Sequence, residues 1–280
     1  MTKSPHVTPA TSAHGSRSAA LAVRDLGVDY GPVTALRAVS HEVAAGEWLG
    51  VIGANGAGKT TLLRALARLT PYHGEVTVNG RDTAKLSARH FAQLVAYVPQ
   101  KPEFPPEMRA IDYVALGRLP HLGYFGAEGT RDRERCVDLL ERLRLTFAID
   151  RTLGTLSGGE LQRLVLARAL AQGAPVVLLD EPTSALDLGR RVEALELVDE
   201  LRVERGLTIV SAMHDLTLAA QFCDRLMLLA RGEVVSVGGA TSVLVEESLN
   251  HHFGARVRIL HPGENDVVVV PQRRQRKGTP

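Results

Sequence analysis

The 280-residue chain has little cysteine, few aromatic side chains and no long apolar stretch. Its two cysteines, Cys136 and Cys223, are too few for a disulfide framework or a cysteine-rich zinc site. Six Phe, five Tyr and one Trp argue against a base-stacking nucleic-acid platform. The longest stretches without a charged residue, 4–16 and 234–245, are shorter than the ~18 apolar residues of a membrane span. Because the N-terminus also lacks the apolar core of a signal peptide, we expect a soluble intracellular protein.

The formal net charge of +2 conceals an uneven distribution along the chain. Residues 256–280 hold six Lys or Arg and two Asp or Glu, a net of +4, so the remainder sums to −2. The basic character therefore belongs to the C-terminal tail and does not indicate a nucleic-acid-binding body.

The pattern of apolar runs predicts an α/β protein in which strands alternate with helices. Strands are expected at 21–28, 48–52, 75–78, 94–98, 176–179, 207–213, 226–230 and 234–237, with a further edge strand at 267–270. Helices are expected after Gly58, at 111–116, 133–143, 158–171 and 188–205, and after Asp215. We interpret residues 1–20 as a disordered tail, 21–254 as one domain with a helical part at about 100–172, and 255–280 as an extension with a basic end.

A glycine-rich loop follows the apolar strand at 48–52 and precedes a predicted helix. Its residues 53–60 match G-x-x-x-x-G-K-[ST], a loop whose backbone N–H groups surround phosphate oxygens. Lys59 would supply a full positive charge to the β- and γ-phosphates, and the Thr60 hydroxyl would be a ligand of Mg²⁺. The predicted nucleotide-binding residues of this loop are Gly53, Ala54, Asn55, Gly56, Ala57, Gly58, Lys59, Thr60 and Thr61.

Two adjacent carboxylates end the apolar run at 176–179. A buried parallel strand delivers such residues to the sheet edge where ligands bind in open α/β proteins. We expect Asp180 to hold Mg²⁺ and Glu181 to polarise an attacking water. An acidic pair after a strand is otherwise an ordinary helix cap, but a phosphate loop in the same chain favours the catalytic interpretation.

The segment Leu156-Ser157-Gly158-Gly159-Glu160, followed by Gln162-Arg163, resembles the signature motif of ATP-binding cassette (ABC) ATPases. The order of phosphate loop, helical insertion, signature and acidic strand is also similar to that family. Ser157 and Glu160 equally have the spacing of a helix capping box, and both interpretations can hold together. The resemblance implies a P-loop NTPase fold of the ABC type, with an antiparallel β part and a helical subdomain inserted in a parallel-rich sheet.

Further segments are similar to other motifs of this family. Gln100 resembles the glutamine that senses the metal, and His214 the histidine that contacts the γ-phosphate. Tyr30 resembles the aromatic residue that stacks on adenine, although an exposed turn tyrosine remains an alternative. Ser184, Ala185, Leu186 and Asp187 resemble the loop that precedes the next helix at the dimer interface.

The resemblance also implies a mechanism and partners. In this family two cassettes bind two ATP molecules between them, so Ser157, Gly158, Gly159 and Glu160 would complete a site on a second copy. The implied assembly is a homodimer that uses ATP and Mg²⁺ and joins transmembrane permease subunits at the cytoplasmic face of the membrane.

Shorter similarities, at residues 115–121, 214–216 and 270–272, are to importers of iron–siderophore, haem and cobalamin complexes, which also use a substrate-binding protein. The permease contact is expected near residues 100–121, including Arg118. An ABC exporter subunit and, more remotely, a P-loop small-molecule kinase are the alternatives, and no nucleic-acid partner is expected.

Overall fold

The computed structural model describes residues 18–122, 129–183, 186–263 and 266–273. Its strands are β1 (Ala19–Tyr30), β2 (Val33–Ala44), β3 (Trp48–Ile52), β4 (His73–Val78), β5 (Arg81–Asp82), β6 (Val95–Val98), β7 (Val176–Asp180), β8 (Thr208–Ala212), β9 (Arg225–Ala230), β10 (Glu233–Gly238), β11 (Val257–Leu260) and β12 (Val268–Pro271). Its α-helices are α1 (Lys59–Leu66), α2 (Ala88–Ala92), α3 (Ala110–Ala115), α4 (Thr130–Arg142), α5 (Gly158–Ala171), α6 (Leu188–Arg205), α7 (Leu216–Phe222), α8 (Ala240–Val243) and α9 (Glu246–Phe253). Short 3-10 helices cover Thr83–Lys85, Leu116–His121, Thr146–Ala148 and Leu153–Thr155.

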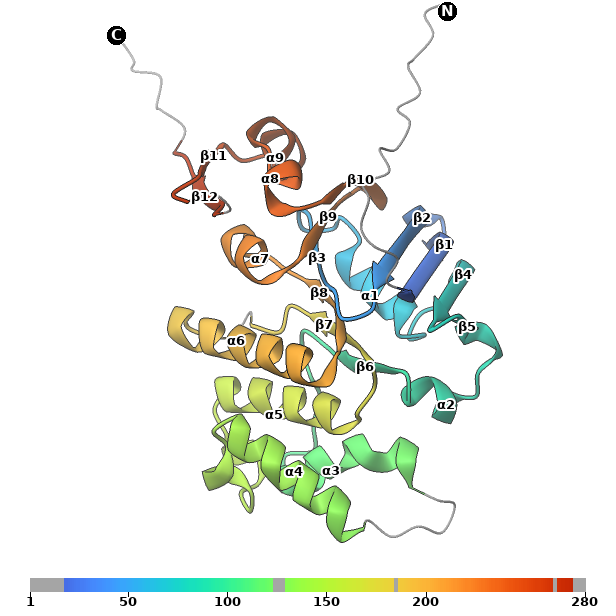
Figure 1. The fold of residues 1–280 in the computed structure, drawn as a ribbon, viewed down its shortest axis with the longest axis vertical. Helices are drawn as coiled ribbons and strands as arrows, with labels where there is room; N and C mark the ends of the chain where they lie inside the picture. The colour runs from blue at the N-terminus through green and yellow to red at the C-terminus, as the bar shows by residue number, and fades with distance from the viewer. Residues whose placement is uncertain (1–17, 123–128, 184–185, 264–265, 274–280) are drawn as a thin grey trace, which may run out of the picture.

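A six-stranded sheet in the order β10-β9-β3-β8-β7-β6 forms the centre of the molecule (Figure 1). Every neighbouring pair from β9 to β6 is parallel, and only β10 runs antiparallel to β9. The α/β class and the parallel-rich sheet are thereby confirmed. Because β3, β6, β7 and β8 share one direction, the residues that follow them gather at a single edge of the sheet.

A second sheet of four antiparallel strands has the order β2-β1-β4-β5, which confirms the predicted antiparallel part. Strand β2 was not predicted from the sequence. Its buried side chains are Leu36, Val39 and Val43, a spacing of three and four residues that is typical of a helix. The β1–β2 register contains irregularities, and Ala38 has a positive φ of 46°. These bulges break the alternation by which a strand is recognised.

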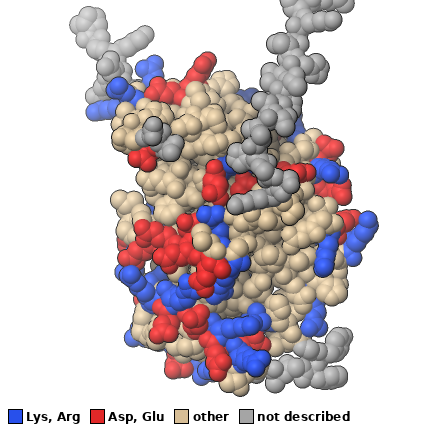
Figure 2. All heavy atoms as spheres, viewed as in Figure 1, with Lys and Arg blue, Asp and Glu red and all other residues tan. Residues whose placement is uncertain are grey.

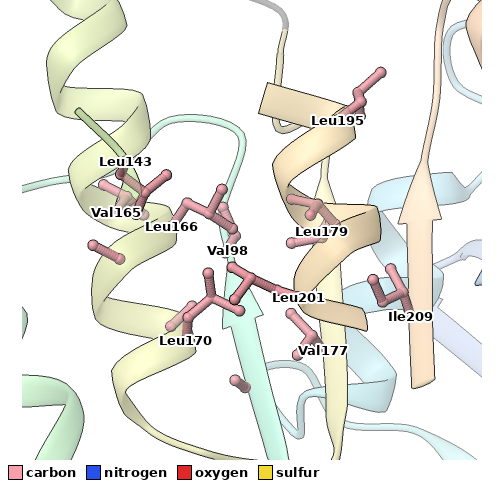
Figure 3. Packing of buried hydrophobic residues seen from close by; sticks show 14 of the residues in the cluster. Val98, Leu143, Val165, Leu166, Leu170, Val177, Leu179, Leu195, Leu201 and Ile209 are labelled. Carbon is pink, nitrogen blue, oxygen red and sulfur yellow. The ribbon is translucent and has the colours of Figure 1, made fainter. Parts of the chain in front are cut away.

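The core consists of two hydrophobic clusters, one on each face of the six-stranded sheet. Along β7, Val177 and Leu179 belong to the cluster that packs against α5 and α6 (Figure 3). The alternate residues Val176 and Leu178 belong to the cluster that includes α1 and the antiparallel sheet. All five residues of β7 are buried, which explains why its first four residues, 176–179, form a continuous apolar run.

The helices between β6 and β7 pack on one another at one end of the molecule, where α3 and α4 both contact α5 (Figure 1). Arg118 lies inside this helical part and is only 6% exposed. Its Nε lies 2.8 Å from Asp132 Oδ1, and its Nη1 donates to the carbonyl oxygen of Ala171 at 2.7 Å. Arg118 therefore links helices and is not an exposed contact residue, whereas the permease contact near residues 100–121 stays a prediction.

Charged side chains interleave on the face shown in Figure 2, where acidic residues gather around α6 and basic residues around the neighbouring helices. Cross-helix ion pairs join Arg142 to Glu204 at 2.6 Å and Arg144 to Glu193 at 3.4 Å. This face carries both signs of charge and is not the one-sign surface typical of nucleic-acid binding.

The C-terminal region differs from the sequence prediction. Residues 267–270 were expected to add an edge strand, but β12 pairs with β11 in a separate two-stranded sheet. The amide of Val269 on β12 donates to Thr217 Oγ1 on α7 at 3.1 Å.

At the N-terminal end, β1 starts at Ala19, two residues before the expected domain boundary. Residues 1–17 and 274–280 lie outside the described ranges. Within those ranges no helix has the length and apolar character of a membrane span.

Candidate active site

The loop between β3 and α1 has a backbone that requires glycine. Gly53 has a φ of 155°, and a Cβ there would lie 2.2 Å from the carbonyl oxygen of Leu229. Gly58 is the N-cap of α1 with a φ of 107°, in the region that other residues rarely adopt. The loop therefore places its backbone N–H groups at the start of α1, where the helix dipole favours an anion.

Lys59 closes over this loop. Its ammonium donates to the carbonyl oxygens of Gly53 at 2.8 Å and Ala54 at 3.2 Å, and the residue is 5% exposed. Burial lowers the pKa of Lys59, and the nearby carboxylates of Glu181 and Asp180 oppose that change. A cation thus lies within a loop of amide donors, which is an arrangement suited to a polyphosphate.

Asp180 joins the end of β7 to the phosphate loop. Its Oδ1 accepts a hydrogen bond from the Thr60 hydroxyl at 3.0 Å, and its Oδ2 accepts one from the Tyr97 hydroxyl at 3.1 Å. Burial raises the pKa of Asp180, and these two hydrogen bonds oppose the rise. A carboxylate and a hydroxyl side by side are hard oxygen ligands of the type that Mg²⁺ prefers.

Glu181 is the point where three strand ends meet. Gln100, which follows β6, donates through Nε2 to Glu181 Oε2, and His214 Nε2, which follows β8, contacts Glu181 Oε1. Glu181 is 7% exposed and has a positive φ of 52°, which is uncommon for a residue with a side chain. Strained backbone of this kind concentrates at functional sites. The structure thus brings together Gln100, Glu181 and His214, three residues predicted from separate motifs.

Ser157 and Glu160 form a reciprocal cap at the start of α5. The Glu160 amide donates to Ser157 Oγ at 3.4 Å, and the Ser157 amide donates to Glu160 Oε2 at 2.7 Å. The capping-box interpretation is therefore confirmed. Ser157 and Gly158 are exposed, and a Cβ at Gly158 would meet nothing within 4 Å. No hydrogen bond or ion pair of the described residues connects this turn to the phosphate loop.

Two other predicted residues lie apart from Glu181. Tyr30, at the end of β1, is 48% exposed, and its hydroxyl accepts a hydrogen bond from Thr70 Oγ1 at 3.3 Å. Asp187 caps α6, where its Oδ1 accepts from the Arg190 amide at 3.0 Å. Ser184 and Ala185 lie outside the described residues.

Tyr97 is a site residue that sequence reasoning missed. Burial and the neighbouring Asp180 raise the pKa of its hydroxyl, so it acts as a neutral donor to that carboxylate. Tyr97 lies in β6, directly beside β7, and this pairing of strands leaves no local signal in the sequence. The fold and this site define a nucleotide-binding cassette of the P-loop class.

Comparison with known proteins agrees with the geometry. The profile of the ABC transporter family matches residues 36–184. The chain is 36% identical to the iron(3+)-hydroxamate import ATP-binding protein FhuC of Bacillus subtilis, over 83% of this chain and 87% of that protein. It is 40% identical to the cobalamin import ATP-binding protein BtuD of Halobacterium salinarum over 90% of its length, although it spans only 63% of that relative. The chain belongs to the ABC transporter family.

Solved structures support the same family. A chain of a transporter described as metal-chelate type, in an inward-facing conformation, matches with a TM-score of 0.78 and 28% identity over 91% of this chain and 98% of that one. A dimeric ATP-binding cassette bound to ADP and phosphate matches with a TM-score of 0.70 and 28% identity over 79% of this chain and 98% of that one.

Proposed function

We propose that this chain is the ATP-hydrolysing subunit of an ABC transporter that imports an iron chelate, haem or cobalamin through a separate permease. The observation that carries the hydrolytic assignment is the meeting of Gln100, Glu181 and His214 beside the phosphate loop. The transported class rests on the import proteins FhuC and BtuD, to which the chain is similar.

The charges of the site account for ATP binding. The loop amides and Lys59 would neutralise the β- and γ-phosphates, and the exposed ring of Tyr30 would stack on the adenine. Thr60, Asp180 and Gln100 would hold Mg²⁺, which when bound offsets the negative charge between the β- and γ-phosphates. The described residues contain no cluster of three His, Cys, Asp or Glu side chains suited to a metal, so phosphate oxygens and water would supply the other ligands.

The carboxylate of Glu181 would orient the attacking water and accept its proton. His214 would hold the γ-phosphate, and Gln100 would fix the carboxylate from the opposite side. A kinase would instead need a bound acceptor hydroxyl near the γ-phosphate. Release of inorganic phosphate without a phosphorylated acceptor would exclude the kinase alternative.

The signature turn at Ser157, Gly158, Gly159 and Glu160 would act on a second copy of the chain, together with the loop that ends at Asp187. Two copies arranged head to tail would enclose two ATP molecules. Hydrolysis would separate the γ-phosphate from ADP and weaken the contact between the copies. The dimeric cassette bound to ADP and phosphate supports this assembly.

The permease would dock in a groove of about 590 Å³ next to β6. Its lining includes the apolar Leu69, Phe91 and Pro99 together with Glu103. Leu69 is 53% exposed, so an amphipathic segment of a partner would cover it. The assembly would lie at the cytoplasmic face of the membrane, with a substrate-binding protein on the other side. If residues 21–254 form one domain with a helical part at about 100–172, as we propose, this groove would lie at the junction of the two parts.

Uptake into vesicles that contain the chain and its permease tests the proposal. Leu69→Glu should abolish ATP-driven uptake of a labelled chelate and leave the ATPase activity of the isolated chain unchanged. Val203→Glu, at a position of α6 that is 71% exposed, is the matched control and should preserve both. ATP-driven efflux in place of uptake would favour the exporter alternative, and normal uptake by Leu69→Glu would contradict the docking groove.

A further inference from the structure

A cavity of about 270 Å³ next to Glu181 contains an arginine that the hydrolytic scheme does not use. Glu181, Thr183, His214, Asp215 and Arg191 are among the residues that line it. Arg191 belongs to the first turn of α6, where its amide donates to the carbonyl oxygen of Asp187 at 2.9 Å. From α6 its guanidinium reaches both the loop that follows β7, at Leu186, and the segment that follows β8, at Asp215.

The guanidinium of Arg191 contacts both segments at once. Its Nη2 donates to the carbonyl oxygen of Leu186 at 3.2 Å, and its Nη1 lies 3.6 Å from Asp215 Oδ2. Its Nε is buried without a hydrogen-bond partner among the described residues. An unpaired buried donor costs free energy, so this arrangement calls for an explanation other than stability alone.

Asp215 transmits the contact to the residue before it. Its Oδ1 accepts from the amides of Thr217 and Leu218, both at 3.1 Å, and so caps α7, while its Oδ2 faces Arg191. The preceding residue is His214, whose ring contacts Glu181. On the other side, the Met213 amide donates to the carbonyl oxygen of Val51. The backbone at His214 is thus held between β3 and the cap of α7.

We propose that Arg191 is a positioning residue for ATP hydrolysis. It fixes the segment that contains His214 against the loop that precedes α6. No hydrogen bond or ion pair of the described residues joins Arg191 to Glu181 or His214, so it acts through Asp215 and Leu186. Arginine suits this task because its planar fork contacts two acceptors in fixed directions, which a lysine ammonium does not reproduce. The inference rests on the proposed roles of Glu181 and His214.

Steady-state ATPase kinetics on Arg191→Ala, Arg191→Lys, Asp215→Asn and the double variant Arg191→Ala/Asp215→Asn test this role. We expect Arg191→Ala to lower kcat about tenfold, because small misplacements of reacting groups cost at least this much. KM for ATP should change less than about twofold, since no hydrogen bond or ion pair of the described residues joins Arg191 to the phosphate loop. The kcat of Arg191→Lys should lie between those of wild type and Arg191→Ala.

The double variant separates positioning from an independent effect. If Arg191 acts through Asp215, the kcat of the double variant should equal that of the less active single variant. If the two residues act independently, the two losses of kcat should multiply. Arg144→Ala removes an exposed ion pair to the same helix and is the control, with kcat unchanged.

A lower melting temperature with wild-type kcat in both Arg191 variants would overturn the proposal and leave a structural role only. Arg191→Lys provides the readout if Arg191→Ala does not fold. Glu181→Gln, measured in parallel, distinguishes the two levels of failure. Normal hydrolysis by Glu181→Gln would contradict the proposed site itself, whereas its loss together with normal Arg191→Ala would contradict this inference alone.

Discussion

The carboxyl edge of the central sheet and the amino end of α5 differ in how far their polar groups are paired with other segments of the same chain. At the sheet edge, Asp180 and Glu181 are buried and contact residues from other segments through both of their oxygens. At α5, the side-chain hydrogen bonds of Ser157 and Glu160 among the described residues join only these two residues, and a Cβ at Gly158 would meet nothing within 4 Å.

This difference fits the proposed assembly, in which the turn at Ser157 would act on a second copy of the chain. The sheet edge holds the groups that we propose bind phosphate and orient water, and Lys59, Asp180 and Glu181 among them are buried. The turn at Ser157 is held in helical geometry by its own cap, with its backbone donors available at the protein surface. In the proposed assembly one chain carries two half-sites of different character, and neither should hydrolyse ATP alone.

Loss of the catalytic carboxylate is the strongest test of the sheet-edge half. Glu181→Gln should lower kcat for ATP hydrolysis by roughly 10²–10⁴-fold, because it removes the general base and keeps the shape of the side chain. Binding of ATP should remain, and size-exclusion chromatography with ATP should show a stable dimer. A monomeric variant that hydrolyses ATP at the wild-type rate would contradict the assignment.

Ser157 allows the capping role and the phosphate role to be separated. Ser157→Asp preserves an N-cap side chain but places a negative charge where the second copy's ATP would bind. It should abolish hydrolysis while the free energy of unfolding stays within about 0.5 kcal/mol. Ser157→Ala should instead lower that free energy by about 1 kcal/mol and retain more activity than Ser157→Asp. Chemical denaturation measures the free energy of unfolding, and ATPase assays measure the activity. Equal activities of Ser157→Asp and Ser157→Ala would contradict the distinction between the two half-sites.

Tyr97→Phe probes how strongly the sheet edge depends on its internal hydrogen bonds. The variant removes the hydroxyl that lowers the pKa of Asp180, so that pKa rises. The acid limb of the Mg²⁺-dependent ATPase profile should move to higher pH, with a loss of about 1 kcal/mol in the free energy of unfolding. An unchanged pH profile would show that the hydroxyl does not act on Asp180.

Among these variants, Glu160→Gln should have the smallest effect, and the effect is on the free energy of unfolding. Hydrogen bonds from Ser157 lower the pKa of Glu160, so its charge stabilises the fold above the ordinary glutamate pKa of about 4.3. That contribution is lost as the pH falls through the lowered pKa. Since Glu160 is only partly buried, the difference from wild type should stay below about 1 kcal/mol and vanish in acid. A difference that persists at pH 3 in urea titrations would indicate another cause.

Much of the fold followed from local patterns. Strand β7 was recognised because burial on both faces leaves a continuous apolar run, and α5 was recognised from the cap at Ser157 and the periodicity that follows. Strand β2 was missed because its bulges give buried residues at Leu36, Val39 and Val43 a helical spacing. The partner of β12 was also missed, because pairing between distant segments leaves no local signal.

The site was predictable where a motif fixes the chemistry and not where only packing does. Lys59, Thr60, Asp180 and Glu181 belong to short segments whose spacing predicts phosphate and metal binding. Arg118 was expected to be an exposed contact residue, yet it is buried and paired with Asp132. The roles of Tyr97 and Arg191 depend on neighbours in space, which one sequence does not reveal.

Mixing two inactive variants tests most directly whether each site needs both half-sites from different chains. Glu181→Gln keeps its signature turn, and Ser157→Asp keeps its catalytic carboxylate, so a mixed dimer contains one intact site. The account predicts that equal amounts together regain about a quarter of the wild-type ATPase rate, since half of the dimers are mixed and each has one working site. A mixture that stays as inactive as its separate components would contradict the account.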